Sequence, residues 1–561
     1  MTRMLWPWGG RGCWDQGLAV AAGDGTLWPA QAHEQRLDWP GVAADGVAVV
    51  VGSGEIVFGR DPNAVEQAAR ELRGVVWLHT GDECLVHDSR ALLDRAGVPY
   101  RLWMQCSRPA RYRGESRTML MGWQPDCRDL VRPLGGGPLA QRRNDWCFTG
   151  QVNNGRRHEC AQVLDGMSGG VLRVSAGFAQ EVVPRAEHLR LLTDSRIAPC
   201  PSGAWSPESF RLYEALEAGA LPVCDRRSDK WEPGEATYWR HVLGEEPFPC
   251  VDSWDEFPAL VRRYQSDPVA LQRDANRAGA WWLGYKRRFA LDLADDVAAL
   301  GGDAAPGHAV TVLMPSSPTP SHPSTEMLED TVARLRAYPE LRGAEILLML
   351  DGVRGEQADR AEAYEEYRRR VVELCAWDSR FTGVLPIVHA EHLHQAEMTR
   401  RALDLARTPL VLFVEHDTYP HGEIDWPGLF RVASREDVDA VRLHIFDRVM
   451  PEHVPLYGQR REVDGVPVIP TRQWSQRPHL AKASWYRRMI AELFAQEDRT
   501  MIEDRVHGLA DLAAGAAPWR MFVYAPEGDM TRSGTSDGRR VPGTDTWVPK
   551  YPMLWGGEWR G

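Results

Sequence analysis

Two carboxylates separated by one residue end an apolar run in the last third of the chain. The run Leu410-Val-Leu-Phe-Val414 leads directly into Glu415, His416 and Asp417. Alternation along an extended chain puts Glu415 and Asp417 on the same side of the strand. Two such carboxylates repel each other unless a cation lies nearby, and hard divalent ions favour carboxylate and diphosphate oxygens. The spacing therefore predicts a Mg²⁺ or Mn²⁺ site for a diphosphate. A strand that simply ends in a charged turn is the alternative.

Two earlier segments could add to such a site. The apolar run Ile346–Leu350 ends in an Asp-Gly pair at Asp351. A carboxylate at the tip of a strand can accept hydrogen bonds from a nucleotide base and from ribose. The run Val310–Leu313 is followed by a polar, proline-rich loop that begins with Pro315 and Ser316. Ligands of α/β folds commonly bind at such loops, which follow the carboxyl ends of the strands. For Asp351, a plain Asp-Gly turn is the alternative.

A second candidate site lies in the first half of the chain. A loop rich in proline and serine, residues 199–209, runs into the helical pattern of residues 210–219. Ser206 is predicted to be the N-cap and Pro207 the first helical residue. Free backbone N–H groups and the positive end of the helix dipole would attract a diphosphate there. A hydroxyl and a guanidinium could add to the diphosphate site and a carboxylate could bind ribose: Ser209, Arg211 and Glu214. A well-capped surface helix is the alternative.

These residues need sheets to hold them, and the chain carries the pattern of parallel sheets. Short apolar runs alternate with amphipathic stretches over most of the 561 residues. Continuous apolar runs suit strands that are buried on both faces of a parallel sheet, so we predict an α/β fold. Glycine-rich breaks divide the chain into two α/β units, residues 1–138 and 139–300, a linker at 301–309, and a third α/β domain at 310–561.

The composition excludes several classes of protein. Apolar residues make up 43% of the chain and charged residues 26%, which rules out a globally disordered or fibrous protein. The net charge of −12 argues against a protein that coats nucleic acid through bulk positive charge, but it leaves a local basic cleft open. No run of about 18 apolar residues occurs, so we expect no membrane insertion. Without a signal-peptide pattern at the N-terminus, we expect a cytoplasmic protein.

The N-terminal motifs resemble those of exostosin-like glycosyltransferases. The resemblance rests on six short segments: Trp77–Glu83, Phe148-Thr-Gly150, Arg156-Arg157, Cys200-Pro-Ser-Gly203, Ser209-Phe-Arg211 and Glu214–Val223. It covers roughly residues 70–300 and implies a GT-B fold, in which a pair of Rossmann-like units holds a UDP-sugar donor on the second unit. It also implies that Asp82 or Glu83 faces the cleft at the end of a strand, where either could act as a base.

The C-terminal motifs resemble the acidic metal motif of GT-A glycosyltransferases. This resemblance implies that Asp417 is the main metal ligand, while Glu415 contacts ribose or metal-bound water. Met501-Ile-Glu503-Asp504 looks like the acidic pair that supplies the general base in inverting GT-A enzymes, and we favour Asp504 over Glu503. Such a carboxylate takes the proton of the acceptor hydroxyl as the anomeric carbon is attacked. Acidic residues that are simply favoured in the first turn of a helix are the alternative.

The tail departs from this resemblance at one position. GT-A enzymes often carry a C-terminal histidine as a further metal ligand, whereas residues 529–539 contain none. Thr535 could occupy its place. Four other side chains could substitute as ligands or help to bind the diphosphate: Asp529, Asp537, Arg532 and Arg539. The missing histidine keeps open a protein of a different class, a non-catalytic carbohydrate-binding protein.

A basic and aromatic segment suggests the acceptor. Residues 442–488 carry nine Arg or Lys against four Asp or Glu, with four aromatic residues interleaved: Tyr457, Trp474, Trp485 and Tyr486. This composition suits a phosphate backbone or an acidic polysaccharide, as well as a solvated face. Among the 23 tryptophans, Trp77, Trp205, Trp474 and Trp485 fall at predicted strand ends or loops where they could contact a sugar. The others could fill a large core.

The C-terminal domain also resembles the glycosyltransferases that modify hydroxymethylated pyrimidines in phage DNA. The pieces that carry this resemblance are four: Pro315–Pro323, Leu350-Asp-Gly352, Glu415-His-Asp417 and Ser475–His479. It implies transfer of a sugar to a 5-hydroxymethylpyrimidine, which has to be extruded from the duplex, and a location in the host cytoplasm if a phage encodes the protein. Synthesis of a surface polysaccharide, as by exostosins, is the competing interpretation.

Overall fold

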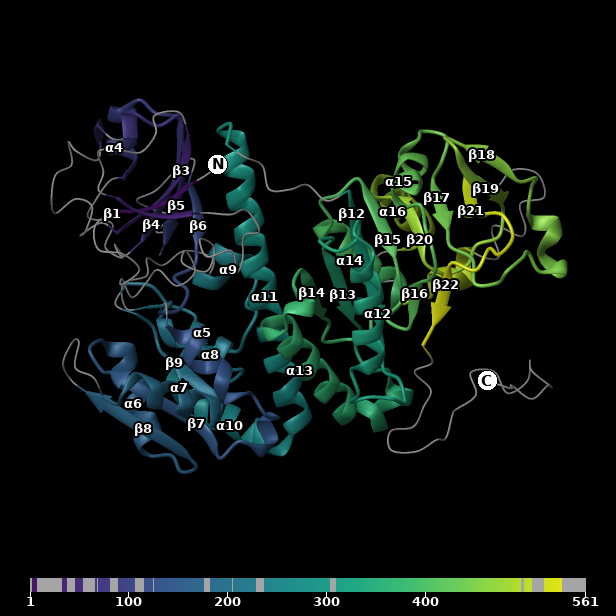
Figure 1. The fold of residues 1–561 in the computed structure, drawn as a ribbon. Helices are drawn as coiled ribbons and strands as arrows, with labels where there is room; N and C mark the ends of the chain where they lie inside the picture. The colour runs from purple at the N-terminus through teal and green to yellow at the C-terminus, as the bar shows by residue number, and fades with distance from the viewer. Residues whose placement is uncertain are drawn as a thin grey trace. The chain divides into compact units, whose positions relative to one another are not determined.

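The computed structural model divides the chain into two compact units, Met1–Pro306 and Gly307–Gly561 (Figure 1). The division falls within the predicted linker at 301–309. Each unit has its own sheets. The structure describes residues 3–7, 33–37, 46–53, 66–67, 69–80, 89–105, 116–124, 126–175, 182–203, 205–228, 237–302, 309–495, 499–506 and 519–536.

The N-terminal unit begins with a six-stranded sheet in the order β2-β1-β3-β4-β5-β6. All of its strand pairs are parallel. The strands are β1 (Arg3–Pro7), β2 (His33–Leu37), β3 (Val47–Ser53), β4 (Gly74–Thr80), β5 (Tyr100–Gln105) and β6 (Ser116–Met119). The apolar run of β4 is buried at every position, as expected for a central strand of a parallel sheet that is covered by helices such as α4 (Ser89–Ala96).

A second parallel sheet follows, in the order β11-β10-β9-β7-β8. Its strands are β7 (Asn144–Gln151), β8 (Gly170–Ser175), β9 (Ser195–Cys200), β10 (Leu221–Asp225) and β11 (Cys250–Val251). The helices around it are α5 (Cys127–Val131), α6 (Gly155–Asp165), α7 (Arg185–Thr193), α8 (Phe210–Glu217), α9 (Tyr238–Leu243) and α10 (Phe257–Ser266). Both sheets therefore have the alternating strand-and-helix order of Rossmann-like units.

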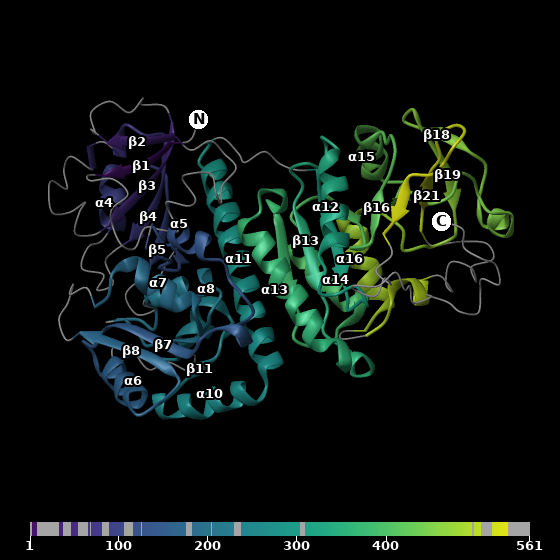
Figure 2. The same cartoon turned by 60° about the horizontal axis from the view of Figure 1, so that its bottom comes forward.

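One long helix, α11 (Pro268–Ala299), contacts both sheets of this unit (Figure 2). Its Asp296 carboxylate accepts a hydrogen bond from Trp103 Nε1 of β5 at 2.9 Å. Its Lys286 ammonium donates to Glu217 Oε1 of α8 at 2.6 Å. Buried polar contacts thus attach the C-terminal end of α11 to β5 of the first sheet and its middle to α8 beside the second sheet.

Most of the described tryptophans of the N-terminal unit fill its core. Trp282 of α11 stacks on Tyr285 with ring centroids 5.6 Å apart and meets Trp123 edge-on at 5.6 Å. Trp77, which we predicted at a cleft-facing strand end, is only 1% exposed. That prediction is wrong, because β4 is a central strand of its sheet and both of its faces are covered.

The C-terminal unit contains one nine-stranded sheet in the order β14-β13-β12-β15-β20-β17-β21-β19-β18. The first four strands are mutually parallel, and β20 pairs antiparallel with both β15 and β17. The strands are β12 (Val310–Ser316), β13 (Ile346–Leu350), β14 (Val384–Val388), β15 (Leu410–Phe413), β17 (Ala440–Arg442), β18 (Arg461–Val463), β19 (Val466–Thr471), β20 (His479–Lys482) and β21 (Met521–Tyr524). A separate antiparallel pair joins β16 (Thr418–Pro420) to β22 (Ser533–Thr535).

Helices cover both faces of this sheet. One core joins strand residues such as Val312 and Leu412 to α12 (Glu326–Ala337), α13 (Ala361–Trp377) and α15 (Trp426–Ser434). On the other face, α14 (His394–Leu405) contacts β12, β13 and α16 (Ala483–Leu493). Short 3-10 turns complete the chain: Arg132–Leu134, Leu139–Gln141, Trp254–Glu256, Gly355–Arg360, Ser379–Phe381 and Pro451–Leu456.

The structure confirms the predicted α/β class with parallel, Rossmann-like sheets. It adds an antiparallel half to the C-terminal sheet that we did not predict, because strands of three to six residues such as β17 and β19 give little periodicity. Among the residues that the structure describes, no helix is both long and apolar enough to cross a membrane.

Candidate functional site

The carboxyl end of β15 is where the C-terminal unit gathers its polar side chains. Phe413 of β15 lies opposite His479 of β20, and His479 lies opposite Arg442 of β17. Because β20 is antiparallel to its two neighbours, β15 and β17 end where β20 begins. Three stretches that are far apart in the sequence therefore meet at what we call the β15 edge: residues 414–417, 443–448 and 474–478.

Glu415 is held by a side chain from α14. Gln395 Nε2 donates to Glu415 Oε1 at 2.9 Å, and the same amide accepts at Oε1 from the backbone N–H of Ile502 at 3.1 Å. Gln395 is buried, so both contacts are shielded from water. One side chain therefore ties the acidic motif to the helical turn at residues 502–506.

Asp417 is positioned through its backbone. Its carbonyl oxygen accepts from Ser536 N at 2.7 Å and from Thr535 Oγ1 at 3.0 Å. Thr418 pairs with Thr535 where β16 meets β22, so the tail lies beside the acidic motif. The Asp417 carboxylate is half-exposed. It makes no hydrogen bond or ion pair with any other residue that the structure describes.

The donor set at this edge fits a divalent ion that also binds a diphosphate. The described residues contain no group of three or more His, Cys, Asp or Glu that could hold a metal by themselves. Mg²⁺ is commonly bound by one or two carboxylates together with phosphate oxygens and water. Glu415 and the unpaired carboxylate of Asp417 supply that many ligands, and hard oxygen ligands of this kind suit Mg²⁺ or Mn²⁺.

Asp351 lies at the tip of β13, as predicted, but its carboxylate faces the protein. It is 2% exposed and accepts hydrogen bonds from the backbone N–H groups of Gly352 at 2.8 Å, Leu393 at 2.7 Å and His394 at 3.1 Å. His392 Nδ1 lies 2.8 Å from its Oδ2 atom. Asp351 therefore fixes the loop that precedes α14, and its contact to ribose stays a prediction.

Pro315 and Ser316 lie at the end of β12, and both are buried. The Ser316 hydroxyl is 3.1 Å from Tyr367 Oη, and its carbonyl accepts from Asp351 N at 2.9 Å. The carbonyl of Pro315 accepts from His416 N at 3.2 Å. The backbone carbonyl groups of these two residues thus bind the backbone of Asp351 and of the acidic motif. A direct contact between either residue and the donor stays a prediction.

The acidic pair Glu503 and Asp504 lies beside the same edge. Glu503 is half-buried, and its Oε1 atom accepts from the backbone N–H of Gln476 at 3.4 Å. Asp504 is exposed and opposes the lowering of the His394 pKa. Burial is the main cause of that lowering, followed by the charges of Arg354 and His392. The charge of Asp504 therefore acts on His394, the first residue of α14.

The aromatic residues predicted to contact the acceptor lie in the core instead. Trp474, Trp485 and Tyr486 are all buried. The rings of Trp474 and Trp485 are 6.1 Å apart, and Trp485 meets Trp519 edge-on at 6.2 Å. The prediction of an exposed stacking platform is wrong for these three residues, because their rings pack against one another and against His479 of β20. Tyr457 is half-exposed.

In the N-terminal unit, the predicted helix begins later than expected. α8 starts at Phe210, and Ser209 is its N-cap with an extended backbone (φ −152°). Ser206 and Pro207 precede the helix, so their predicted capping roles are wrong. The reason is Glu208, whose carboxylate is fully buried and accepts from Met121 N at 2.7 Å, while Tyr213 and Tyr238 also donate to it.

Arg211 and Glu214 are buried and paired within the protein. Arg211 Nε donates to the carbonyl of Thr149 at 3.1 Å. Glu214 is 3% exposed, and Arg185 Nη1 and His188 Nε2 lie 2.5 Å and 2.9 Å from its carboxylate oxygens. Burial alone would raise the pKa of Glu214, but these two partners lower it to about 2.

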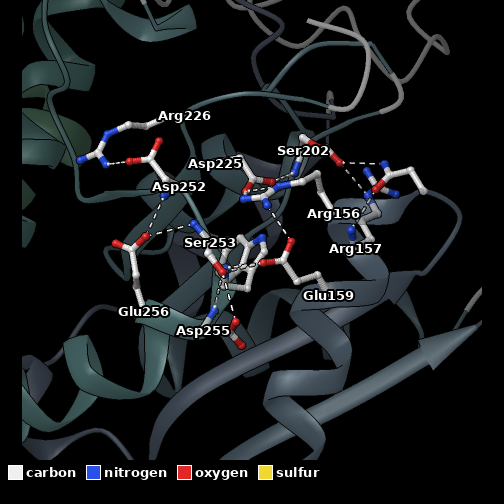
Figure 3. A network of polar contacts seen from close by, with 12 residues as sticks. Arg156, Arg157, Glu159, Ser202, Asp225, Arg226, Asp252, Ser253, Asp255 and Glu256 are labelled. Carbon is white, nitrogen blue, oxygen red and sulfur yellow. Dashed lines mark hydrogen bonds and ion pairs between the residues drawn. The ribbon is translucent and has the colours of Figure 1, made fainter.

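Arg156 and Arg157 belong to a network at the carboxyl end of β10 whose acidic members we did not predict (Figure 3). We call it the β10 edge. Asp225, the last residue of β10, is fully buried and accepts from Arg156 Nε at 2.9 Å and from Ser202 N at 2.7 Å. Burial raises the pKa of Asp225. Arg156 Nη1 also donates to Glu159 at 2.6 Å, and Arg157 Nε donates to the carbonyl of Ser202 at 2.9 Å.

Several predicted residues lie outside the described part of the chain. These are Asp82, Glu83, Asp537 and Arg539. Two other tail residues are described. Asp529 Oδ1 accepts from Thr531 N at 2.8 Å, and Arg532 Nη1 donates to the carbonyl of Thr531 at 2.6 Å. Trp205 is half-buried, and its carbonyl accepts from Ser228 Oγ at 2.9 Å.

Solved structures similar to parts of this chain are transferases of nucleotide sugars and nucleotides. Residues 1–349 of S. aureus TarS match with 13% identity over 39% of this chain and 59% of that one, with a TM-score of 0.25. The mannosyltransferase PcManGT from Pyrobaculum calidifontis, in complex with GDP-Man and Mn²⁺, matches with 14% identity over 46% of this chain and 69% of that one, with a TM-score of 0.26. A UDP-glucose pyrophosphorylase complexed with UDP-glucose matches with 11% identity over 39% and 91%, with a TM-score of 0.24.

No protein-family model matches the sequence, and no curated protein matches it. At TM-scores of 0.26 and below, the solved structures decide neither the fold nor the activity of this chain. The side chains at the β15 edge are therefore what indicates a function for this chain.

Proposed function

We propose that this protein is a nucleotide-sugar-dependent glycosyltransferase with a GT-A module in its C-terminal unit. The observation that carries the proposal is the link through Gln395, which binds Glu415 of the acidic motif and the backbone of Ile502. This link supports a site in which Glu415 and Asp417, which suit a metal-bound diphosphate, lie near the second acidic pair, Glu503 and Asp504, at one edge of the sheet. Transfer of a sugar from a diphosphate to a hydroxyl needs a charge-neutralising group on one side and a base on the other.

On the donor side, Asp417 is the main metal ligand, and Glu415 contacts the ribose or water on the ion. A bound Mg²⁺ or Mn²⁺ neutralises the charge that develops on the departing diphosphate. Asp351 fixes the loop before α14, and this loop places Gln395 beside Glu415. Pro315 and Ser316 support Asp351 and the acidic motif through the hydrogen bonds of their carbonyl groups.

On the acceptor side, Asp504 removes the proton from the attacking hydroxyl, with Glu503 as the second candidate. The acceptor oxygen forms a bond to the anomeric carbon while the bond from that carbon to the diphosphate oxygen breaks. The nucleoside diphosphate leaves on the opposite side, so the configuration inverts. Asp504 is favoured because it is exposed, whereas Glu503 is half-buried and accepts the hydrogen bond of Gln476 N.

For the acceptor we propose the hydroxyl of a 5-hydroxymethylpyrimidine in DNA. Arg442 and Arg477 lie at the β15 edge, and cationic side chains there suit a polyanionic acceptor. The overall charge of −12 confines any contact with DNA to a local surface of this kind. A surface polysaccharide is the competing acceptor.

For the N-terminal unit we propose a GT-B-like, exostosin-like module that binds a UDP-sugar beside α8. The Ser209 hydroxyl supports this, because it is buried without a hydrogen-bond partner among the described residues and thus retains its full capacity for a ligand. Arg211 and Glu214 hold the strands and helices around it. The module either adds a second sugar or serves for binding.

The test combines purified protein with Mn²⁺ or Mg²⁺, a set of UDP-sugars, and duplex DNA that contains hydroxymethylcytosine or hydroxymethyluracil. The DNA is digested to nucleosides, and a modified nucleoside heavier by one hexose residue is expected. Asp417→Ala and Asp504→Asn should lose this product. Transfer to a polysaccharide but not to DNA would support the competing acceptor. If no donor is hydrolysed or transferred under any condition, the protein is not a glycosyltransferase.

A further inference from the structure

Arg442 is a buried cation that has no role in the proposed donor site or in the proton transfer. It ends β17 and is 7% exposed. Its Nη2 atom donates to Tyr457 Oη and, at 3.4 Å, to Gln473 Oε1, and both acceptors are neutral. Its Nε atom is buried without any hydrogen-bond partner among the described residues. Because a guanidinium stays charged at all physiological pH values, this side chain retains both a charge and a donor that lack an anionic partner.

A second arginine adds to the positive charge at this place. Arg477, three residues after Trp474 and just before β20, is half-exposed, and its charge acts on Arg442. Within the described ranges, neither guanidinium forms an ion pair with a carboxylate. Glu503 is the acid whose charge reaches Arg442, and it is held by Gln476 N. Two positive charges therefore face one negative charge.

His444, two residues beyond β17, does not add a third charge. Burial, followed by the charge of Arg442, lowers the pKa of His444 to about 4, although the hydrogen bond to the carbonyl of Arg448 opposes this. At neutral pH its ring is uncharged and donates from Nε2 to that carbonyl at 3.0 Å. The positive charge beside Gln473 and Tyr457 thus comes from Arg442 and Arg477 rather than from His444.

We propose that Arg442 and Arg477 form an anion subsite that binds a phosphodiester group of the acceptor strand, next to the hydroxyl that receives the sugar. The inference rests on the proposed function, because Glu503 borders the subsite and belongs to the same acidic pair as the proposed base. Guanidinium groups match the paired oxygens of a phosphate, and a bound phosphate supplies the charge and the acceptors that Arg442 lacks. A bound phosphate would also offset the desolvation free energy of burying the Arg442 guanidinium, a penalty that an uncharged side chain would avoid.

Binding can be measured separately from catalysis. The probe is a fluorescently labelled, single-stranded thymidine 12-mer, compared with the same oligomer whose linkages are uncharged methylphosphonates. The main variant is Arg477→Gln, since this side chain is half-exposed and its loss leaves the core intact. The matched control is Arg431→Gln, which removes the same charge from an exposed position on α15.

The expected result is that Arg477→Gln weakens binding of the phosphodiester oligomer by about tenfold and reduces the slope of log affinity against log salt by about one. Binding of the methylphosphonate oligomer should not change, and Arg431→Gln should behave like the wild type. Equal losses in Arg477→Gln and Arg431→Gln would overturn the subsite, as would equal losses for the charged and uncharged oligomers. Tighter, Arg477-dependent binding of polygalacturonate would assign the subsite to carboxylates and overturn the phosphodiester assignment.

Arg442→Lys provides a second measurement, because it retains the charge but removes the Nε donor. It should weaken binding of the phosphodiester oligomer while leaving binding of the methylphosphonate oligomer unchanged. If this variant does not fold, the binding measurements on Arg477→Gln decide whether the anion subsite exists. A wild-type protein that hydrolyses and transfers no donor disproves the proposed function, whereas the oligomer measurements still decide whether the anion subsite exists.

Discussion

The β10 edge and the β15 edge both lie at carboxyl ends of parallel strands, but they differ in whether their charged side chains are paired. At the β10 edge, Asp225 is matched by Arg156 and the Ser202 N–H, and Glu159 shares the same arginine. At the β15 edge, the carboxylate of Asp417 and the guanidinium of Arg477 have no ion-pair partner among the described residues. Paired charges at the first edge hold loops together, whereas unpaired charges at the second are available to a ligand.

This contrast separates two kinds of charged residue that look the same in a sequence. Asp225 and Asp417 both follow a short apolar run. The partner that each one meets depends on which helix begins opposite the strand end. α6 brings Arg156 to Asp225, while the tail at Asp417 contributes only a backbone N–H and a hydroxyl, both to its carbonyl oxygen.

The largest expected effect is on activity at the β15 edge. Asp417→Ala should lower the rate of sugar transfer by about 1,000-fold or more, because metal-borne stabilisation of a transition state is worth several kcal/mol. Its free energy of unfolding should change by less than about 0.5 kcal/mol, since the carboxylate makes no contact to lose. Rates come from donor hydrolysis and transfer, and stability from urea unfolding. The control is Asp404→Ala, at an exposed position on α14. If Asp417→Ala transferred sugar at the wild-type rate, the unpaired carboxylate at the β15 edge would have no role in binding the donor.

The next effect is on stability at the β10 edge. Arg156→Met should lower the free energy of unfolding by about 3–5 kcal/mol, because it leaves Asp225 buried without its cation. Arg190→Met breaks an exposed pair on α7, whose two side chains are 50% and 31% exposed, and should cost about 0.3–0.5 kcal/mol. Urea unfolding measures both variants. If Arg156→Met and Arg190→Met lowered the free energy of unfolding by similar amounts, burial would not be what makes the Arg156–Asp225 pair strong.

The third effect depends on pH. The folded-state pKa of Glu214, about 2, lies below its ordinary value of 4.5. Ionised Glu214 therefore stabilises the fold above about pH 5, and this contribution is lost as the pH falls from about 5 to about 2. The full contribution is about 3 kcal/mol at 1.36 kcal/mol per pKa unit. The stability gap between wild type and Glu214→Gln should shrink over this range, and a gap that is the same at pH 3 and pH 6 would contradict it.

The smallest effect is at the tail. Thr535→Val keeps the shape of the side chain but removes its hydrogen bond to the Asp417 carbonyl at 3.0 Å. Because the residue is exposed, the loss should be about 0.5–1 kcal/mol, with a small fall in the transfer rate. Thermal unfolding and donor hydrolysis measure the two changes. A loss as large as that of Asp417→Ala would mean that Thr535 itself contacts the ligand.

The parallel half of the fold could be predicted from the sequence because its strands are uninterrupted apolar runs. Ile346–Leu350 and Leu410–Phe413 are such runs, and the acids that end them, Asp351 and Glu415, lie at strand tips as expected. The sequence could not show which carboxylate faces the solvent. Besides the N–H of Gly352, Asp351 accepts from two backbone N–H groups, those of Leu393 and His394, in a loop some 40 residues later, and no local pattern indicates such a partner.

Burial of polar and aromatic side chains was the main source of error. Glu208 sits in a Ser-Pro-Glu-Ser stretch that is typical of an exposed helix start, yet its carboxylate accepts from Met121 N, which follows the other sheet of the unit. Trp474 and Trp485 follow polar neighbours, yet they pack against each other. In each case a contact distant in sequence decides the outcome, and local periodicity carries no information about it.

The pairing of β22 with β16 has a consequence for the protein while it is being made. The acidic loop is complete only when Thr535 and Ser536 reach the backbone of Asp417, and Thr535 lies 118 positions later in the chain. At a synthesis rate of 5–20 residues per second, roughly 6–24 s separate the two positions on the ribosome. During that time the nascent chain carries Glu415 and Asp417 without the strand that pairs with the segment after them. The order of synthesis thus leaves this acidic loop unpaired until residues 533–536 have been translated.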